Sequence, residues 1–171
     1  DRELDITEIF SDLEIIEDIS NFCLTGSIAI TDTTGIKEFL PILGGEKLKI
    51  LFNTDDTFED FKAEFIITKL AEENKINEQR NIRSIKLYFT SVEFVDNFKK
   101  QFSKSYNQKK VSYIINDVFT NQLKSKKELN IEESINYIDY IIPFKNPFNT
   151  FNFCCKHSLS SENNDSGYLF F

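Results

Sequence analysis

The spacing of apolar residues changes once along this chain, and the change limits the folds that the chain can adopt. Over the first hundred residues or so, apolar and polar side chains alternate. In residues 47–53, for example, Leu48, Ile50 and Phe52 share one face. Alternation over four to eight residues indicates a half-buried β-strand. Further along, apolar residues recur at helical spacing, so the sequence predicts an α+β fold that is mainly β.

Five alternating runs are separated by turn-forming residues, and they lie near residues 13–15, 27–32, 47–53, 61–67 and 85–90. Between them we expect a short helix at 36–40 that Pro41 ends, a Gly44-Gly45 turn, a polar turn at 53–57 and a polar loop at 72–81. Five strands at this spacing predict a small antiparallel barrel or sandwich.

Helical spacing begins after the last of these strands. Val95, Phe98 and Phe102 fit a short helix with Ser91 as its N-cap. Residues 109–123 fit a longer helix, on which six apolar residues share a face: Val111, Ile114, Ile115, Val118, Phe119 and Leu123.

A strand at 137–142, ended by Pro143, follows this helix. Asn146 and Pro147 then give an N-cap and a first-turn proline, and the face of the next helix is Phe148, Phe151, Cys155 and Leu159. After a loop at 160–166, Gly167 opens a last apolar strand. Because the period changes near residues 99–108, we predict two domains, 1–103 and 104–171.

The composition is that of a globular protein, with 40% hydrophobic and 28% charged residues and 18 Phe. The net charge of −8 argues against a nucleic-acid groove, which needs clustered Lys and Arg. Residues 124–127 (KSKK) form the one notable basic cluster, which we interpret as a solvated helix end. Three Cys, two of them adjacent, do not make a disulfide framework and indicate folding in a reducing compartment.

One group of residues has the types that bind metals or act as nucleophiles, namely Cys154, Cys155 and His157. A structural zinc site needs four ligands, and adjacent Cys on a helix point about 100° apart. A Cys–His pair would also need an orienting group and an oxyanion hole, and neither is visible. We therefore interpret Cys155 as a core residue and His157 as a surface or boundary residue.

Other candidate groups also have simpler structural interpretations. The acidic pairs Asp55-Asp56 and Glu72-Glu73 fall in predicted turns, where carboxylates are usually solvated. Gly44-Gly45 lacks the Lys-Ser or Lys-Thr that completes a phosphate loop. We predict a protein that is not an enzyme and has no cofactor and no metal.

Several segments, taken in order, resemble one family. Residues 13–19 (LEIIEDI) and 24–32 (LTGSIAITD) resemble the opening hairpin of the baseplate hub proteins of contractile-tailed phages, and 40–48 (LPILGGEKL) resembles their next element. Residues 87–91 (LYFTS) with 103–106 (SKSY) resemble their strand, helix and Ser-Lys-Tyr segment. The Pro-Phe helix from Pro147 and the strand at 167–171 (GYLFF) are similar to the same family and also to the hub part of type VI secretion spike proteins.

The resemblance implies a structural protein of the virion. Hub proteins of this family have a tail-tube-like antiparallel β-barrel, two such barrels per chain, and form a homotrimeric ring. The expected partners are the tail tube protein, the central spike protein and other baseplate proteins, with the hub assembled in the host cytoplasm. In this interpretation residues 1–103 form one barrel and residues 104–171 begin a second, incomplete hub domain. The family implies no catalytic residues.

DNA would pass through such a ring without specific binding. An acidic lumen suits this role because it repels phosphate. The residues we expect on the lumen are Asp55, Asp56, Glu59 and Asp60.

Three alternatives remain open: the hub of a type VI secretion or bacteriocin-type spike, a tail tube subunit, and an enzyme that uses Cys154 or His157. The segment after Lys104 disfavours the tube subunit. Because the chain begins without Met and ends in an apolar run, we also expect it to be a fragment of a longer protein.

Overall fold

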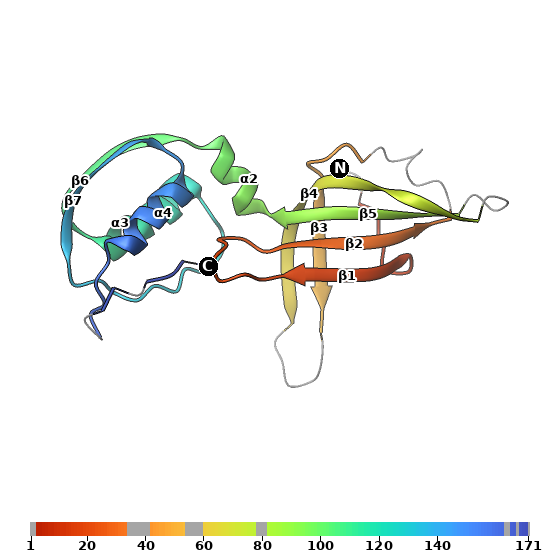
Figure 1. Cartoon of the computed structure of the whole chain (residues 1–171), viewed down its shortest axis with the longest axis horizontal. Helices are drawn as coiled ribbons and strands as arrows, with labels where there is room; N and C mark the ends of the chain where they lie inside the picture. The colour runs from red at the N-terminus through yellow and green to blue at the C-terminus, as the bar shows by residue number, and fades with distance from the viewer. Residues whose placement is uncertain are drawn as a thin grey trace. The chain divides into compact units, whose positions relative to one another are not determined.

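The computed structural model describes residues 3–33, 42–53, 60–77, 82–162, 165–166 and 168–170, with 72–77 described by their backbone alone. Strands dominate this part of the chain, and the fold is α+β and mainly β, as the apolar pattern predicts (Figure 1). The elements in chain order are β1 (Phe10–Ile16), β2 (Thr25–Asp32), β3 (Lys47–Phe52), β4 (Phe61–Asn77), β5 (Ile82–Ser91), α2 (Val92–Lys99), β6 (Phe102–Lys110), α3 (Val111–Asp117), the π-helix η1 (Val118–Leu123), β7 (Tyr137–Lys145) and α4 (Pro147–Lys156).

The chain divides into two compact units. Unit 1 comprises Asp1–Glu17 and Leu24–Val92, and unit 2 comprises Asp18–Cys23 and Glu93–Phe171. The short segment between β1 and β2 therefore belongs to unit 2. The predicted domains 1–103 and 104–171 stay a prediction, but their limit falls inside β6, whereas the compact units divide at 92/93.

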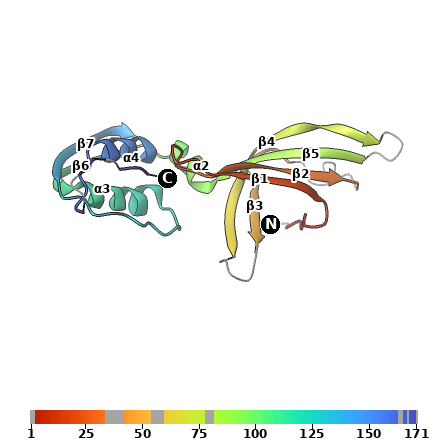
Figure 2. The ribbon, with the colours of Figure 1, turned by 60° about the horizontal axis from the view of Figure 1, so that its bottom comes forward.

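Unit 1 is a curled, antiparallel half-barrel sheet with the strand order β1-β2-β5-β4-β3. The long strand β4 has two partners, since residues 61–66 pair with β3 and residues 65–77 pair with β5. The register shifts between Ile67 and Lys69, and such a bulge bends a strand. Figures 1 and 2 show β3 and the first part of β4 turned away from the direction of β5 and β2. The pairing in the described part of the sheet leaves β1 and β3 as its two edges.

The core of unit 1 lies on one face of this sheet, where nine buried residues form a cluster: Ile28, Ile30, Leu48, Ile50, Phe65, Ile67, Ile85, Leu87 and Phe89. Gly26 pairs with Phe89 across β2 and β5. A Cβ at residue 26 would lie 2.6 Å from the Phe89 ring and 2.2 Å from the carbonyl oxygen of Glu14 on β1. Only glycine therefore lets β1, β2 and the Phe89 ring approach this closely.

A tight turn fixes the entry to β3. Gly44 and Gly45 have φ values of +99° and +97°, which side chains rarely adopt. The Glu46 carboxylate accepts hydrogen bonds from the N–H groups of Leu43 (2.8 Å) and Gly44 (2.9 Å). The Gly45 N–H donates to the carbonyl of Ile67 in β4 at 2.8 Å. The Gly-Gly-Glu pattern in the sequence thus forms a hydrogen-bonded turn that fixes the start of β3 against β4.

Unit 2 is a two-stranded antiparallel ribbon, β6 with β7, that curves around α3 and α4 (Figure 1). Its core has twelve buried residues: Tyr106, Val111, Ile114, Ile115, Val118, Phe119, Leu123, Tyr140, Ile142, Phe148, Phe151 and Cys154. Phe22, from the segment between β1 and β2, packs against this core with its ring 5.0 Å from that of Phe148 and 5.5 Å from that of Phe170.

The N-terminus of α4 has two separate caps. The Asn146 side chain accepts a hydrogen bond from the Asn149 N–H at 3.0 Å, and Pro147 occupies the first helical position, as predicted. The buried Asn97 of α2 accepts a hydrogen bond from the Phe148 N–H at 2.8 Å. Together these side chains satisfy two of the amide groups that a helix start leaves without a helical partner.

Most of the predicted elements are present, but several predictions were wrong. Residues 72–77 continue β4 and are not part of a loop. Phe102 lies in β6 and not in the helix before it. β7 runs through Pro143 to Lys145, because the ribbon register shifts beside that proline. Residues 168–170 form no strand. The helix expected at 36–40 lies outside the described residues.

The two predicted helical faces are buried, apart from one residue of the second. The helix predicted at 109–123 is present from 111 to 123, but Lys109 and Lys110 belong to β6, and the second half of the helix is a π-helix. On α4, Phe148, Phe151 and Cys155 are buried as predicted. Leu159 lies beyond the end of α4 and is 38% exposed, so its placement on that face was wrong.

Candidate functional site

The two edges of the unit 1 sheet carry opposite charge. On β1, Asp12 and Glu14 are exposed on the face opposite the core. On β3, Lys47 and Lys49 are exposed on the same face. We call these the acidic edge and the basic edge. Unpaired strand edges readily pair with another chain.

Exposed apolar side chains accompany both edges. Phe10 and Ile16 of β1 are 47% and 48% exposed, and Leu51 of β3 is 69% exposed. Lys49 forms an exposed ion pair with Glu3 at 3.0 Å, within the same chain. Each edge strand thus combines exposed charges of one sign with apolar surface, and at the basic edge Lys49 already has Glu3 as a partner.

Unit 1 carries the whole net charge of the chain. Its sequence has 18 Asp and Glu against 10 Lys and Arg, which gives −8, whereas unit 2 has 10 of each and is neutral. The acidity inferred from composition is therefore a property of the sheet unit. Of the predicted lumen residues, Asp60 is exposed and accepts a hydrogen bond from the Asn53 side chain at 2.6 Å. Asp55, Asp56 and Glu59 lie outside the described residues.

The cysteines of α4 are buried and poorly suited to nucleophilic chemistry. Burial, with a smaller contribution from Cys155, raises the pKa of the Cys154 thiol to about 12, and burial also raises the pKa of Cys155. Thiols with raised pKa values stay protonated near neutral pH and are inert. Burial likewise raises the pKa of Cys23 to about 12.

His157 lies at the C-terminal end of α4 and is exposed, in line with its predicted surface or boundary position. Its ring stacks on Phe153 at 4.0 Å, with Nδ1 2.8 Å from the Phe153 carbonyl oxygen. Within the described residues, no group of three or more His, Cys, Asp or Glu is placed to hold a metal ion. That the protein is not an enzyme stays a prediction.

The Ser-Lys-Ser-Tyr segment of β6 links the ribbon to α3. The Tyr106 hydroxyl donates a hydrogen bond to the Asp117 carboxylate, and the Lys104 ammonium lies 2.6 Å from the same carboxylate. Burial raises the pKa of Asp117, but hydrogen bonds from Lys104, Tyr106 and Asn121 outweigh it, so the pKa lies below its ordinary value. The sequence motif therefore makes a partly buried polar crosslink, with Asp117 as the acceptor that sequence analysis missed.

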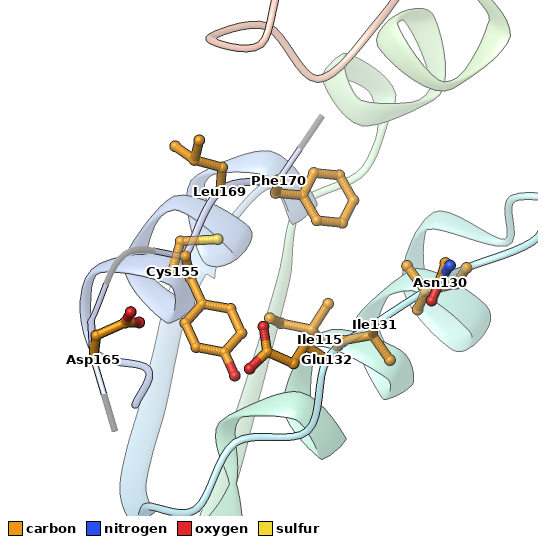
Figure 3. A pocket seen from close by; sticks show the side chains of 10 residues that line it. Ile115, Asn130, Ile131, Glu132, Cys155, Asp165, Leu169 and Phe170 are labelled. Atoms are coloured by element: carbon orange, nitrogen blue, oxygen red, sulfur yellow. The ribbon is translucent and has the colours of Figure 1, made fainter. Parts of the chain in front are cut away.

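A pocket of about 310 Å³ opens in unit 2 (Figure 3). Ile115 and Cys155 line it from α3 and α4, and Ile131 and Glu132 line it from the chain that precedes β7. Leu129, Asn130, Asp165, Tyr168, Leu169 and Phe170 complete the lining. Glu132 accepts a hydrogen bond from the Ser160 hydroxyl. The lining mixes apolar groups with the carboxylates of Glu132 and Asp165, and burial raises the pKa of Cys155, the one thiol among the lining residues.

Comparison with known proteins gives no family for this chain. No protein-family model matches it, and no curated protein matches it. In the described part of the chain, no helix is long and apolar enough to cross a membrane.

Proposed function

We propose that this chain is a structural component of a phage tail baseplate hub, which joins the tail tube to the central spike and lines the DNA channel. Three copies form a ring, in which residues 1–103 act as the tube-like domain and residues 104–171 begin a second hub domain. Its partners are the tube protein, the spike protein and other baseplate proteins, and it resides in the virion tail. The resemblance in the sequence motivates this proposal.

The observation that carries the proposal is the open sheet of unit 1 with its oppositely charged edges. An open sheet is completed either by closing on itself or by pairing with another chain. A head-to-tail contact joins two different surfaces, and such contacts generate rings when the rotation closes. Asp12 and Glu14 on the acidic edge complement Lys47 and Lys49 on the basic edge of the next copy.

Strand direction is consistent with this contact. β1 and β3 are the first and fifth strands of an all-antiparallel sheet, so they run in the same direction. Rotation about a ring axis leaves the direction of a strand along that axis unchanged, so with strands running along the axis β3 of one copy would pair in parallel with β1 of the next. The contact also covers exposed apolar groups such as Leu51 and Ile16.

A charge exchange tests the proposal. Lys47→Glu with Lys49→Glu should abolish the ring, and so should Asp12→Lys with Glu14→Lys, because each places like charges at the contact. All four changes together should restore the ring, since the complementarity is then reversed but intact. The readout is native mass measurement of the complex, and circular dichroism checks that each variant is folded.

The control is Lys109→Glu with Lys126→Glu, which makes the same charge change at exposed residues of unit 2. These variants should keep the ring. The competing interpretation is that edge lysines only prevent unwanted pairing. It predicts that Lys47→Glu with Lys49→Glu increases self-association and that the fourfold variant does not restore the ring. These two outcomes together would refute edge pairing.

A further inference from the structure

The exposed face of the unit 1 sheet carries a second basic feature, away from both edges. Tyr88 of β5 and Lys69 of β4 lie directly opposite each other in the register, and Lys86 precedes Tyr88 by two residues on the same face. The ammonium nitrogens of Lys69 and Lys86 lie 5.8 Å and 5.7 Å from the centre of the Tyr88 ring. We call these three residues the Lys-Tyr-Lys cluster.

The electrostatics of this cluster favour an added anion. Two ammonium groups share one aromatic ring, and each such contact contributes only about 0.5–1 kcal/mol at an exposed site. The ion pairs found within the described residues do not include Lys69 or Lys86. A carboxylate in contact with either ammonium group would supply the opposite charge that these ion pairs do not provide.

Among the described side chains, Asp12, Glu14 and Glu64 share this face, and none of them forms an ion pair with Lys69 or Lys86. In the register, Asp12 is separated from Lys86 by Ala29, and Glu14 is separated from Tyr88 by Ser27. Strands lie about 4.8 Å apart, so each separation is about 10 Å, close to the screening length of physiological salt. The cluster is thus a local positive site in a unit whose net charge is negative.

We propose that the Lys-Tyr-Lys cluster binds an acidic segment of a partner protein, with two or more closely spaced Asp or Glu side chains. The ammonium groups take the carboxylates, and the Tyr88 ring, which is 38% exposed, packs against the methylene groups that carry them. β5 is the central strand and β4 its neighbour, so edge pairing between copies would leave the cluster uncovered. This proposal therefore does not depend on the ring.

Single-stranded nucleic acid fits the face less well. Such binding uses several aromatic side chains on which successive bases stack, together with a continuous basic groove. Within the described part of the sheet, Tyr88 is the one aromatic residue on the face opposite the core. Asp12 and Glu14 on the same face, and the net charge of unit 1, would repel an extended phosphate backbone.

The test is a titration of the chain with a hexaglutamate peptide, in which calorimetry or amide chemical shifts measure the binding. Lys69→Gln with Lys86→Gln should weaken binding at least tenfold, and Tyr88→Ser should weaken it severalfold. The matched control is Lys62→Gln with Lys156→Gln, which removes the same charge from exposed positions outside the cluster and outside both edges. This control should change binding less than twofold.

Two results would overturn the proposal. Equal losses in the cluster and control variants would show only diffuse attraction to lysines. Tighter, cluster-dependent binding of an oligothymidylate than of hexaglutamate would assign the face to nucleic acid. Neither result depends on the ring, which native mass measurement of the same variants follows separately.

Discussion

Replacing Phe22 by Ala should destabilise unit 2, although residue 22 lies between two strands of unit 1. Its half-buried ring contacts the rings of Phe148 and Phe170 in the unit 2 core. Truncating a fully buried Phe costs about 3–5 kcal/mol, so a half-buried ring should cost about 2 kcal/mol. Because 1.4 kcal/mol is a factor of ten, the protected amides of α3 and α4 should exchange roughly thirtyfold faster with solvent. Hydrogen exchange followed by mass spectrometry measures this segment by segment.

The matched control is Ile19→Ala, a truncation in the same segment at a side chain that is 58% exposed. It should leave exchange in α4 almost unchanged. If Phe22→Ala instead accelerated exchange in β2 and β5 while α4 stayed protected, residues 18–23 would belong energetically to unit 1, and our assignment of this segment would be refuted.

Three further predictions concern single residues. Gly26→Ala should destabilise unit 1 by at least about 2 kcal/mol in thermal denaturation, because its methyl group meets the Glu14 carbonyl and the Phe89 ring; a stability equal to wild type would contradict that packing. Phe119→Ala and Phe151→Ala should each cost about 3–5 kcal/mol, whereas His157→Ala should change folding and assembly little, and the reverse order would show that the helix face is wrongly assigned. The pKa of Asp117 is lowered on folding, so its contribution to stability is present above the ordinary carboxyl pKa and is lost as the pH falls through the lower, folded value. Denaturant titrations between pH 5 and 2 should therefore show a smaller loss of stability for Asp117→Asn than for wild type, and equal losses would count against the crosslink.

The strands of unit 1 were predictable because one face of the sheet is buried and the other is solvated. Alternation then appears directly in the sequence, as in Leu48 and Ile50 of β3. The same signal is missing from β6, whose sequence from 102 to 110 is mostly polar. There the inward positions include Lys104, which contacts Asp117, and Tyr106, whose ring packs in the core while its hydroxyl donates a hydrogen bond to Asp117. A strand that buries a polar crosslink has no hydrophobic period to detect.

The candidate interaction sites could be anticipated only in part. The sequence shows acidic residues near β1 and lysines in β3, but it does not show that these strands are the two edges of one sheet. The strand order, with β5 between β2 and β4, decides this, and it depends on pairings between distant residues. The Lys-Tyr-Lys cluster has the same origin, since Lys69 and Tyr88 meet only through the register of β4 with β5.

The uneven charge distribution leads to a last prediction, that ring assembly has an optimum salt concentration. If units of −8 charge sit about 30 Å apart, a spacing suited to their size, their unscreened repulsion in water is about 9 kcal/mol per pair. Screening reduces this to about 3 kcal/mol at 0.01 M salt and to about 0.2 kcal/mol at 0.15 M. The edge contacts between oppositely charged side chains act over a few ångströms, so they persist at 0.15 M and weaken only towards 1 M salt. The ring dissociation constant, measured by sedimentation, should therefore fall between 0.01 M and 0.15 M salt and rise again near 1 M. A steady rise from the lowest salt would mean that edge attraction dominates throughout and that the charge of unit 1 does not oppose assembly.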